Sequence, residues 1–196
     1  MGLAGQNLIL ASSSVYRQRL LLQLKVSFTC ISPDIDESSL PNESADALTR
    51  RLAITKAARI LQDNPGALVI GSDQVADLDG AVLGKPYDPE RAIAQLTQCS
   101  GKTVRFYTSV ALLSSGMQQV DVVTTWVRFR ALTDEQIRAY IKKEEPLDCA
   151  GSFKCEGLGV ALFESIQSDD PSALIGLPLI SLTRMLHAVG LDVLTQ

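Results

Sequence analysis

Apolar and polar residues alternate in blocks along this chain, and the blocks predict strands and helices in mixed order. Short apolar runs predict strands, whereas apolar residues spaced three or four positions apart predict helices. The predicted strands are residues 7–11, 28–31, 68–75, 104–113, 120–129 and 158–163, with a hairpin over 76–83. The predicted helices are residues 15–24, 44–64 and 172–189, and two more begin at Asp88 and Thr133. This mixture, with one long antiparallel pair, favours a single α/β unit with a mixed sheet.

Turn and capping residues mark where several of these elements begin and end. Asp79-Gly80 lies between apolar flanks and is a strong hairpin signal. Pro65-Gly66 stops the long helix before it, and Asp88-Pro89 is typical of a helix start. Thr133 and Gln136 have the spacing of a capping box. These signals support the same order of elements as the apolar pattern.

Composition narrows the class of protein. The chain has 196 residues, of which 46% are hydrophobic and 20% charged, so it has enough apolar side chains for a sizeable core. This length suggests one domain or two small ones. The formal net charge is −4, with no block of like charge. Stable binding to nucleic acid or to an anionic membrane needs a basic face, and the composition argues against both.

The N-terminus and the cysteines favour a cytoplasmic protein. Residues 1–14 have no charged leader and no apolar span of membrane length, so they predict a first strand rather than a signal peptide or membrane helix. Cys149 and Cys155 lack zinc-knuckle spacing, and only His187 could add a nitrogen ligand, which disfavours structural zinc. Reduced cytosolic thiols are the default state for such cysteines.

Asp73 is the most informative single residue, because it lies near the end of the apolar strand 68–75. Open α/β sheets bind ligands at this end of their strands. A buried carboxylate is costly unless it is paired, metal-bound or catalytic. Lys85 follows on a Gly-Lys-Pro turn. Either Asp73 binds a metal or acts as a base while Lys85 neutralises phosphate, or the two are a turn cap and a surface lysine.

Serines between the first strand and the first helix form a second candidate site. A helix N-terminus offers backbone N–H groups and a positive dipole to an anion. Ser12 and Ser14 add hydroxyl groups, and Arg17, one turn into the helix, could bind a phosphate with two parallel hydrogen bonds. The alternative is ordinary serine capping beside a solvated arginine.

Two other charged groups also have two interpretations. The polar segment 32–44 predicts a loop, and its Asp34, Asp36 and Glu37 could share a magnesium ion with the strand-end aspartate. The alternative is a solvated loop. Lys56 lies on a helix with several arginines, and such a basic face is usually solvated as well.

Several familiar catalytic sites are excluded by what the sequence lacks. The lone His187 lies near the end of an apolar helix, far from these clusters, so no Ser-His-Asp arrangement can be built. There is also no Walker lysine motif and no GxGxxG, so neither a P-loop nor a Rossmann dinucleotide site is supported.

In this order, the motifs resemble the Maf family of nucleotide pyrophosphatases over nearly the whole chain. The matching segments are LASSSVYRQRLL, Asp36-Glu37, RLAITKA around Lys56, IGSDQV, GKP, SGK at 100–102, EPLDCAGSFKCEGLG and IGLPL at 175–179. In detail they resemble the YceF-type subgroup, whose implied activity is hydrolysis of 7-methyl-GTP to 7-methyl-GMP and pyrophosphate. The resemblance implies one Maf/ITPase-like domain over residues 1–196, with a mixed twisted sheet flanked by helices and two lobes around a central cleft.

The resemblance also implies roles for individual residues, together with a divalent metal, Mg²⁺ or Mn²⁺. The catalytic residues are Asp73 and Lys85, the substrate-binding residues are Ser12, Ser14, Arg17 and Lys56, the residues that set specificity are Tyr16, Gln74 and Glu156, and the metal ligands are Asp73 and Glu37.

The three specificity positions carry a physical argument. Maf branches that resemble dTTP/UTP pyrophosphatases have Arg, Thr and Gln there. In this chain, Tyr16 could stack on the cationic 7-methylguanine ring, and Glu156 could accept hydrogen bonds from N1–H and the exocyclic amine. The chain departs from the family at Val15, where proline is usual, and at Tyr16, where this subgroup is expected to have Trp.

Two other functions stay open. One is hydrolysis of dTTP, UTP or a broad range of nucleotides. The other is a non-catalytic, nucleotide-binding regulator of septum formation, although the acid and lysine set argues against a pure binder. The resemblance implies a small-molecule nucleotide as partner and a cytoplasmic location, and it is compatible with a homodimer.

Overall fold

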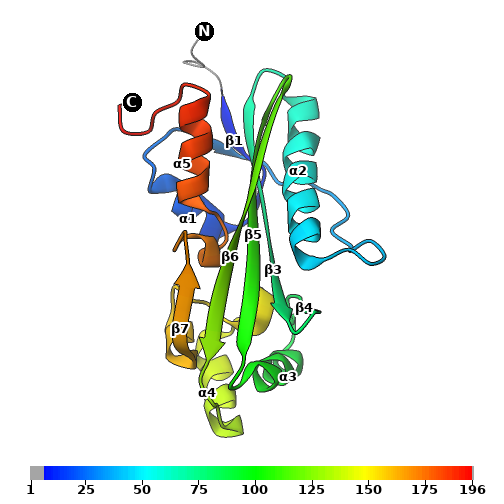
Figure 1. The fold of residues 1–196 in the computed structure, drawn as a ribbon, viewed down its shortest axis with the longest axis vertical. Coiled ribbons are helices and arrows are strands. Elements are labelled where there is room, and N and C mark those ends of the chain that lie inside the picture. Colours follow the sequence, from blue (N-terminus) through cyan, green and yellow to red (C-terminus); the bar gives the residue numbers. More distant parts are fainter. Residues whose placement is uncertain (1–6, 196) are drawn as a thin grey trace. The chain divides into compact units, whose positions relative to one another are not determined.

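The computed structural model describes residues 7–195, and its elements confirm a mixed α/β fold (Figure 1). The chain divides into two compact units. The first contains the described residues of Met1–Asp73, Thr108–Val123 and Asp170–Gln196, and the second contains Gln74–Tyr107 and Thr124–Asp169. The predicted single domain over residues 1–196 includes 1–6 and 196, which lie outside the described residues. That domain, with its two lobes and central cleft, stays a prediction.

Seven strands form one sheet within residues 7–195, in the order β2-β1-β3-β5-β6-β7, with β4 paired to β3. Their bounds are β1 (Leu8–Leu10), β2 (Thr29–Cys30), β3 (Leu68–Leu78), β4 (Ala81–Leu83), β5 (Thr103–Ser114), β6 (Met117–Phe129) and β7 (Phe163–Ser168). β1 runs parallel to β2 and β3, whereas the β3–β4 and β6–β7 pairs are antiparallel. The predicted mixed sheet is therefore confirmed.

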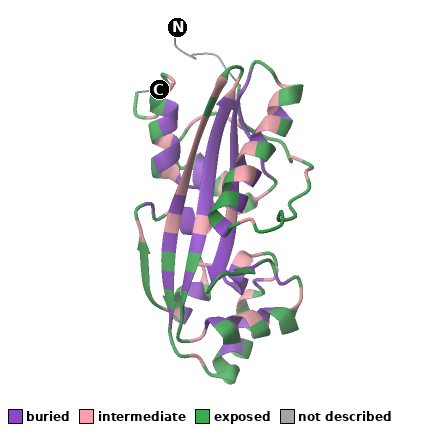
Figure 2. Cartoon of the chain, turned by 45° about the vertical axis from the view of Figure 1, so that its right-hand side comes forward, coloured by how far each residue is buried: buried purple, intermediate pink, exposed green. Residues whose placement is uncertain are grey.

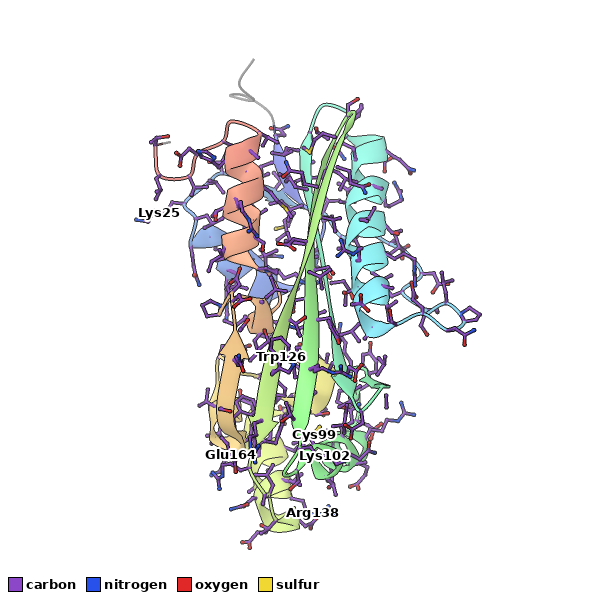
Figure 3. The ribbon with its side chains drawn as sticks, viewed as in Figure 1. Lys25, Cys99, Lys102, Trp126, Arg138 and Glu164 are labelled. Carbon is purple, nitrogen blue, oxygen red and sulfur yellow. The ribbon has the colours of Figure 1, made fainter. Side chains whose placement is uncertain are left out.

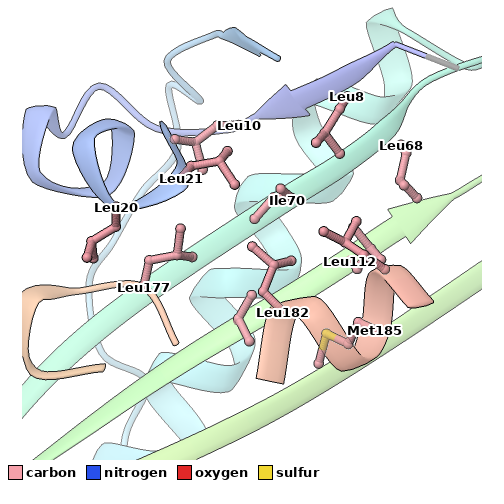
Figure 4. Packing of buried hydrophobic residues seen from close by; sticks show 12 residues of the cluster. Leu8, Leu10, Leu20, Leu21, Leu68, Ile70, Leu112, Leu177, Leu182 and Met185 are labelled. Atoms are coloured by element: carbon pink, nitrogen blue, oxygen red, sulfur yellow. The ribbon is translucent and has the colours of Figure 1, made fainter. Parts of the chain in front are cut away.

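In the first unit, helices pack on both faces of the strands. α1 (Val15–Leu22) and α5 (Leu179–Ala188) contact one face, where the leucines of β1, β3 and β5 gather with theirs (Figure 4). α2 (Ala45–Asp63) contacts the other face through Ala53, Ala57 and Ile60. Because side chains alternate between faces along a strand, successive residues of β3 are buried against different helices. This explains why residues 68–73 are all buried, and Figure 2 shows the long strands largely in purple.

The second unit contains α3 (Pro89–Cys99), α4 (Asp134–Glu144), β4 and β7. Its core includes Phe106, Phe129, Phe153 and Phe163, which meet edge to face with ring centroids 4.9–5.8 Å apart. Such pairs stabilise a core beyond their buried area. Trp126 is exposed on the face of β6 opposite to the buried Val127 and Phe129 (Figure 3). Glu164 lies on β7.

Two predicted elements are wrong in part. Residues Leu158–Leu162 form a short 3₁₀ helix instead of a strand, and β7 begins only at Phe163. The helix predicted over 172–189 is interrupted, because Gly176 has φ 128° and Pro178 precedes the first turn of α5. Only a 3₁₀ turn, Ala173–Ile175, forms before this break. An apolar run does not by itself distinguish these conformations.

The local turn signals are confirmed. Asp79 and Gly80 both have positive φ, 53° and 89°, and join β3 to β4. Thr133 and Gln136 form both hydrogen bonds of the capping box at the start of α4. Among the helices of residues 7–195, none has the length and apolar character needed to cross a membrane.

Candidate active site

The strand predicted over 68–75 continues to Leu78, so Asp73 lies in the middle of β3 and the prediction that it lies near the strand end is wrong. This middle part of β3 lies close to α2 because Gly71 has no side chain. A Cβ atom at position 71 would lie 2.0 Å from the backbone oxygen of Ala53 and 3.0 Å from Ala57 Cβ. Asp73 is two residues further along the strand and so faces the same side as Gly71. The glycine therefore allows the close approach that places Asp73 against α2.

Lys56 of α2 lies between two carboxylates. Its Nζ atom is 2.7 Å from Asp73 Oδ1 and 2.8 Å from Glu37 Oε1. The Lys56 and Asp73 side chains are buried, at 6% and 8% exposure, whereas the Glu37 side chain is 55% exposed. The sequence alone favoured a solvated Lys56; the structure instead buries it in an ion-paired cluster beside the middle of β3.

The loop that carries Glu37 is fixed to α2 by a second ion pair. Arg51 donates through Nε to Glu43 Oε1 at 2.6 Å and through Nη2 to Oε2 at 2.7 Å, and Nη2 also reaches the carbonyl oxygen of Ser38 at 2.9 Å. These bonds lower the pKa of Glu43 to about 2. The loop predicted over 32–44 is thus tied to the helix that bears Lys56.

Only one of the three acidic residues predicted for a shared metal site faces this lysine. Asp34 and Asp36 are exposed. Asp36 Oδ1 accepts a hydrogen bond from the Ser38 backbone N–H at 2.9 Å. The interpretation of Asp34 and Asp36 as solvated loop residues therefore fits the geometry, whereas Glu37 belongs to the cluster.

The serines in the turn between β1 and α1 were predicted either to cap the helix or to lie beside Arg17 at an anion site, and the turn has features of both. Ser14 is the N-cap of α1, and its hydroxyl accepts from the Arg17 backbone N–H at 3.4 Å. Ser12 is buried, and its hydroxyl accepts from the Ser14 N–H at 3.1 Å and lies 3.5 Å from Arg17 Nη1. The serines cap the helix, and one of them also contacts the guanidinium group.

Burial shifts the pKa values of Asp73 and Arg17, and neighbouring charges oppose both shifts. Burial raises the pKa of Asp73 above its ordinary 3.8, although Lys56 and Arg17 oppose this shift. Burial lowers the pKa of Arg17, and the carboxylates of Asp73 and Glu37 oppose that. Asp73 is thus a stronger base than a solvated aspartate, which is typical of a catalytic carboxylate.

The donor chemistry at this cluster suits a divalent cation. Asp73 and Glu37 point their oxygens at one Lys56 Nζ atom, so a cation already sits between them. Mg²⁺ takes one or two carboxylates and completes its shell with water and substrate phosphates. No group of three or more His, Cys, Asp or Glu side chains gathers as a metal site within residues 7–195. The two carboxylates at Lys56 are a number of protein ligands that fits Mg²⁺.

Three of the predicted site residues belong to the second unit, and the structure leaves their roles untested. Gln74 directly follows Asp73 on β3 and is half-buried. Lys85 is exposed on the loop after β4, and Glu156 is exposed in a turn, where its Oε2 atom lies 3.6 Å from Cys155 Sγ. Tyr16, in the first unit, is half-buried on α1.

Sequence reasoning missed several residues around Arg17. Ser72 is fully buried, and its hydroxyl donates to the carbonyl oxygen of Gly176 at 2.8 Å. Arg17 Nε donates to the same oxygen, also at 2.8 Å. The only signal was the matching IGLPL segment, to which no role was attached. A backbone carbonyl has no sequence signature of its own.

Comparison with known proteins shows the family to which this chain belongs. A family model described as "Maf-like protein" matches residues 7–189. The 7-methyl-GTP pyrophosphatase of Xanthomonas axonopodis pv. citri is 53% identical over 95% of this chain and 98% of that protein. The proteins of the same name from Pseudomonas aeruginosa and Bordetella pertussis are 53% and 52% identical, over 95% and 96% of this chain and 98% and 94% of theirs.

Among solved structures, the Ham1 protein of Staphylococcus aureus aligns with 79% of this chain and 90% of its own. It is 16% identical, with a TM-score of 0.49.

Proposed function

This chain belongs to the Maf family, and we propose that it hydrolyses 7-methyl-GTP to 7-methyl-GMP and pyrophosphate. The observation that carries the chemistry is the buried Asp73–Lys56 pair beside Glu37 and Arg17. The substrate rests on relatives that bear the name 7-methyl-GTP pyrophosphatase, at about half identity over nearly the full length of both chains.

In the proposed reaction, Asp73 acts as general base. Its Oδ1 atom bonds to Lys56 Nζ, and within residues 7–195 Oδ2 makes no hydrogen bond, which leaves it for a water molecule. Asp73 takes a proton from the water as the water attacks the α-phosphorus, and the bond to the β-phosphate oxygen breaks to release pyrophosphate. A carboxylate with a raised pKa suits this transfer.

Cationic side chains hold the triphosphate in this proposal. Arg17 and Lys56 neutralise phosphate charge from the first unit, and Ser12 and Ser14 add hydroxyl groups at the helix N-terminus. Lys85 covers the charge on the leaving pyrophosphate. In phosphoryl transfer, positioning and charge stabilisation supply most of the acceleration.

A divalent metal, Mg²⁺ or Mn²⁺, bound through Asp73 and Glu37, would neutralise phosphate charge and lower the pKa of a bound water. Lys56 would then shift its pairing toward the phosphates, because it now stands between the same two carboxylates.

Base recognition is assigned to Tyr16, Gln74 and Glu156. Tyr16 stacks on the methylated base, and a cation–π contact contributes about 0.5–2 kcal/mol. Ionised Glu156 accepts from two neighbouring guanine donors and complements the positive charge of the ring. Gln74 follows the proposed catalytic acid in the sequence, and its amide can form hydrogen bonds with the sugar or the base. A cytoplasmic location accords with four cysteines that are all free thiols, and a homodimer stays a prediction.

The test is pyrophosphate release from 7-methyl-GTP, GTP, dTTP and UTP, measured side by side with Mg²⁺ or Mn²⁺. We expect a strong preference for 7-methyl-GTP. A preference for dTTP or UTP would keep the Asp73 chemistry and refute the base assignment, whereas binding without turnover would favour the regulator. The triple variant with Tyr16→Arg, Gln74→Thr and Glu156→Gln should move the ranking toward the pyrimidine nucleotides.

A further inference from the structure

Two donors from different elements converge on one backbone oxygen beside Arg17. Arg17 Nε, on α1, and the Ser72 hydroxyl, on β3, both donate to the carbonyl oxygen of Gly176 at 2.8 Å. A carbonyl oxygen has two lone pairs, so this acceptor is fully used. Because Ser72 alternates with Asp73 along the strand, it faces the side opposite to the catalytic acid.

The turn that presents this carbonyl is held by its own network. Asp170 is 2% exposed; its Oδ1 accepts from the Ser172 N–H at 3.1 Å and its Oδ2 from the Ile180 N–H, in the first turn of α5, at 2.7 Å. Thr108 of β5 donates to the carbonyl oxygen of Ala173 at 2.9 Å. The turn is therefore tied to both a helix and a strand of the first unit, which fixes the direction of the Gly176 carbonyl.

The bond to Gly176 determines which edge of the guanidinium group is available. Nε is occupied, and Nη1 lies 3.5 Å from Ser12 Oγ. Within residues 7–195, no hydrogen bond reaches Nη2. A guanidinium group binds an oxyanion through a pair of N–H donors, and with Nε occupied only the Nη1/Nη2 end remains for a bidentate contact.

We propose that Ser72 and the Gly176 carbonyl are positioning groups that aim the Nη1/Nη2 end of Arg17 at a phosphate of the substrate. The inference rests on the proposed function, because it takes Arg17 as a phosphate-binding residue. Ser72 acts only through the Gly176 peptide and Arg17, and it does not touch the substrate.

The first test is Ser72→Ala. Loss of one hydrogen bond that fixes the acceptor loosens the guanidinium, so we expect KM for 7-methyl-GTP to rise about three- to tenfold, with kcat within about twofold. The matched control is Ser109→Ala, because Ser109 is also fully buried in the first unit and bonds to Thr49 Oγ1 at 2.8 Å, away from Arg17. That control should lower the melting temperature and leave KM unchanged. If Ser72→Ala does not fold, Ser72→Cys keeps the volume and a weak donor and should raise KM by less.

A double-mutant cycle separates positioning from a general loss of structure. Lysine at position 17 has no planar fork to aim, so in an Arg17→Lys background Ser72→Ala should leave KM unchanged. Additive effects of the two substitutions, or an unchanged KM in Ser72→Ala alone, would overturn the proposal.

Binding of inorganic tripolyphosphate with Mg²⁺, measured by calorimetry, tests the inference without turnover. If the protein binds tripolyphosphate about three- to tenfold more weakly after Ser72→Ala but does not hydrolyse 7-methyl-GTP, the proposed substrate fails and the positioning role stands. If the unaltered protein binds no tripolyphosphate, Arg17 has no phosphate to receive and the inference fails.

Discussion

The two faces of β3 make different kinds of contact through residues that are adjacent in the sequence. On the face toward α2, Gly71 allows close approach and Asp73 meets a buried lysine. On the opposite face, Ile70 packs into the leucine cluster and Ser72 bonds to the Gly176 carbonyl. One face holds charges, and the other holds a neutral hydrogen-bond network that reaches Arg17.

In the proposed function, this difference lets one stretch of strand carry a catalytic acid on one face and a positioning group on the other. Successive residues of β3 point to opposite faces, so adjacent Ser72 and Asp73 contact different partners, the Gly176 carbonyl and Lys56 of α2. The charged face depends on burial and pairing, which set the pKa of Asp73. The neutral face depends on backbone geometry. Variants on the charged face should therefore lose turnover, whereas variants on the neutral face should raise KM.

The largest expected effect is on the charged face, at Asp73. Asp73→Asn keeps the shape and removes the base, so we expect turnover to fall about 10²–10⁴-fold with the fold retained by circular dichroism. Asp77→Asn is the matched control, because Asp77 is also buried on β3 but accepts from the Gly80 N–H at 2.9 Å. It should keep turnover. Near-normal pyrophosphate release by Asp73→Asn would remove Asp73 from its role.

The next largest expected effect is a loss of stability when Gly71 gains a side chain. The Cβ of Gly71→Ala would lie 2.0 Å from a backbone oxygen of α2, which cannot rotate away. We expect a loss of about 3 kcal/mol in the free energy of unfolding, measured by urea denaturation. Gly66→Ala has open space around its Cβ and should be nearly neutral. Equal midpoints for the two variants would refute the close approach as the reason for the glycine.

β3, the turn after it and the start of α4 were predicted well from the sequence, because their signals are local. The apolar run before Asp73, the Asp79-Gly80 turn and the capping box at Thr133 each act over a few residues, and the structure confirms them. The resemblance to the Maf family is confirmed by the match over residues 7–189.

What the sequence could not predict depends on contacts between distant segments. Lys56 looked like one more residue of a basic helix, and only its distance to Asp73 shows that it is buried and paired. The Gly176 carbonyl belongs to a turn 159 residues beyond Arg17. The predictions for 158–163 and 172–189 were wrong in part, because an apolar run does not distinguish a strand from a 3₁₀ helix and does not show the break at Gly176 and Pro178.

A smaller effect is expected on the neutral face, at Gly176. Its φ of 128° is unfavourable for other residues, although a Cβ there would lie 3.6 Å from Arg17 Nε, an ordinary contact. Gly176→Ala should cost about 1–2 kcal/mol of stability and raise KM, because the carbonyl turns away from Arg17. Gly116→Ala is the control, since Gly116 has φ 82° and open space. It should lose similar stability in thermal denaturation and keep KM. If both variants change KM alike, backbone strain alone explains the result.

The smallest expected effect is a pH dependence of stability at the ion pair between Glu43 and Arg51 of α2. Arg51 holds the pKa of Glu43 at about 2, below its ordinary 4.5. A lowered folded-state pKa gives stability that is present above the unfolded value and is lost as pH falls toward the folded value. The unaltered protein should therefore melt higher than Glu43→Gln at pH 7, and the difference should shrink between about pH 4.5 and pH 2. The pair is partly exposed, with 29% of the Arg51 side chain and 8% of the Glu43 side chain in contact with solvent, so screening limits its contribution. We therefore expect a shift of only a few degrees by calorimetry. Arg51→Met should abolish the same difference, and a gap that stays constant down to pH 2 would show that Arg51 does not lower the pKa of Glu43.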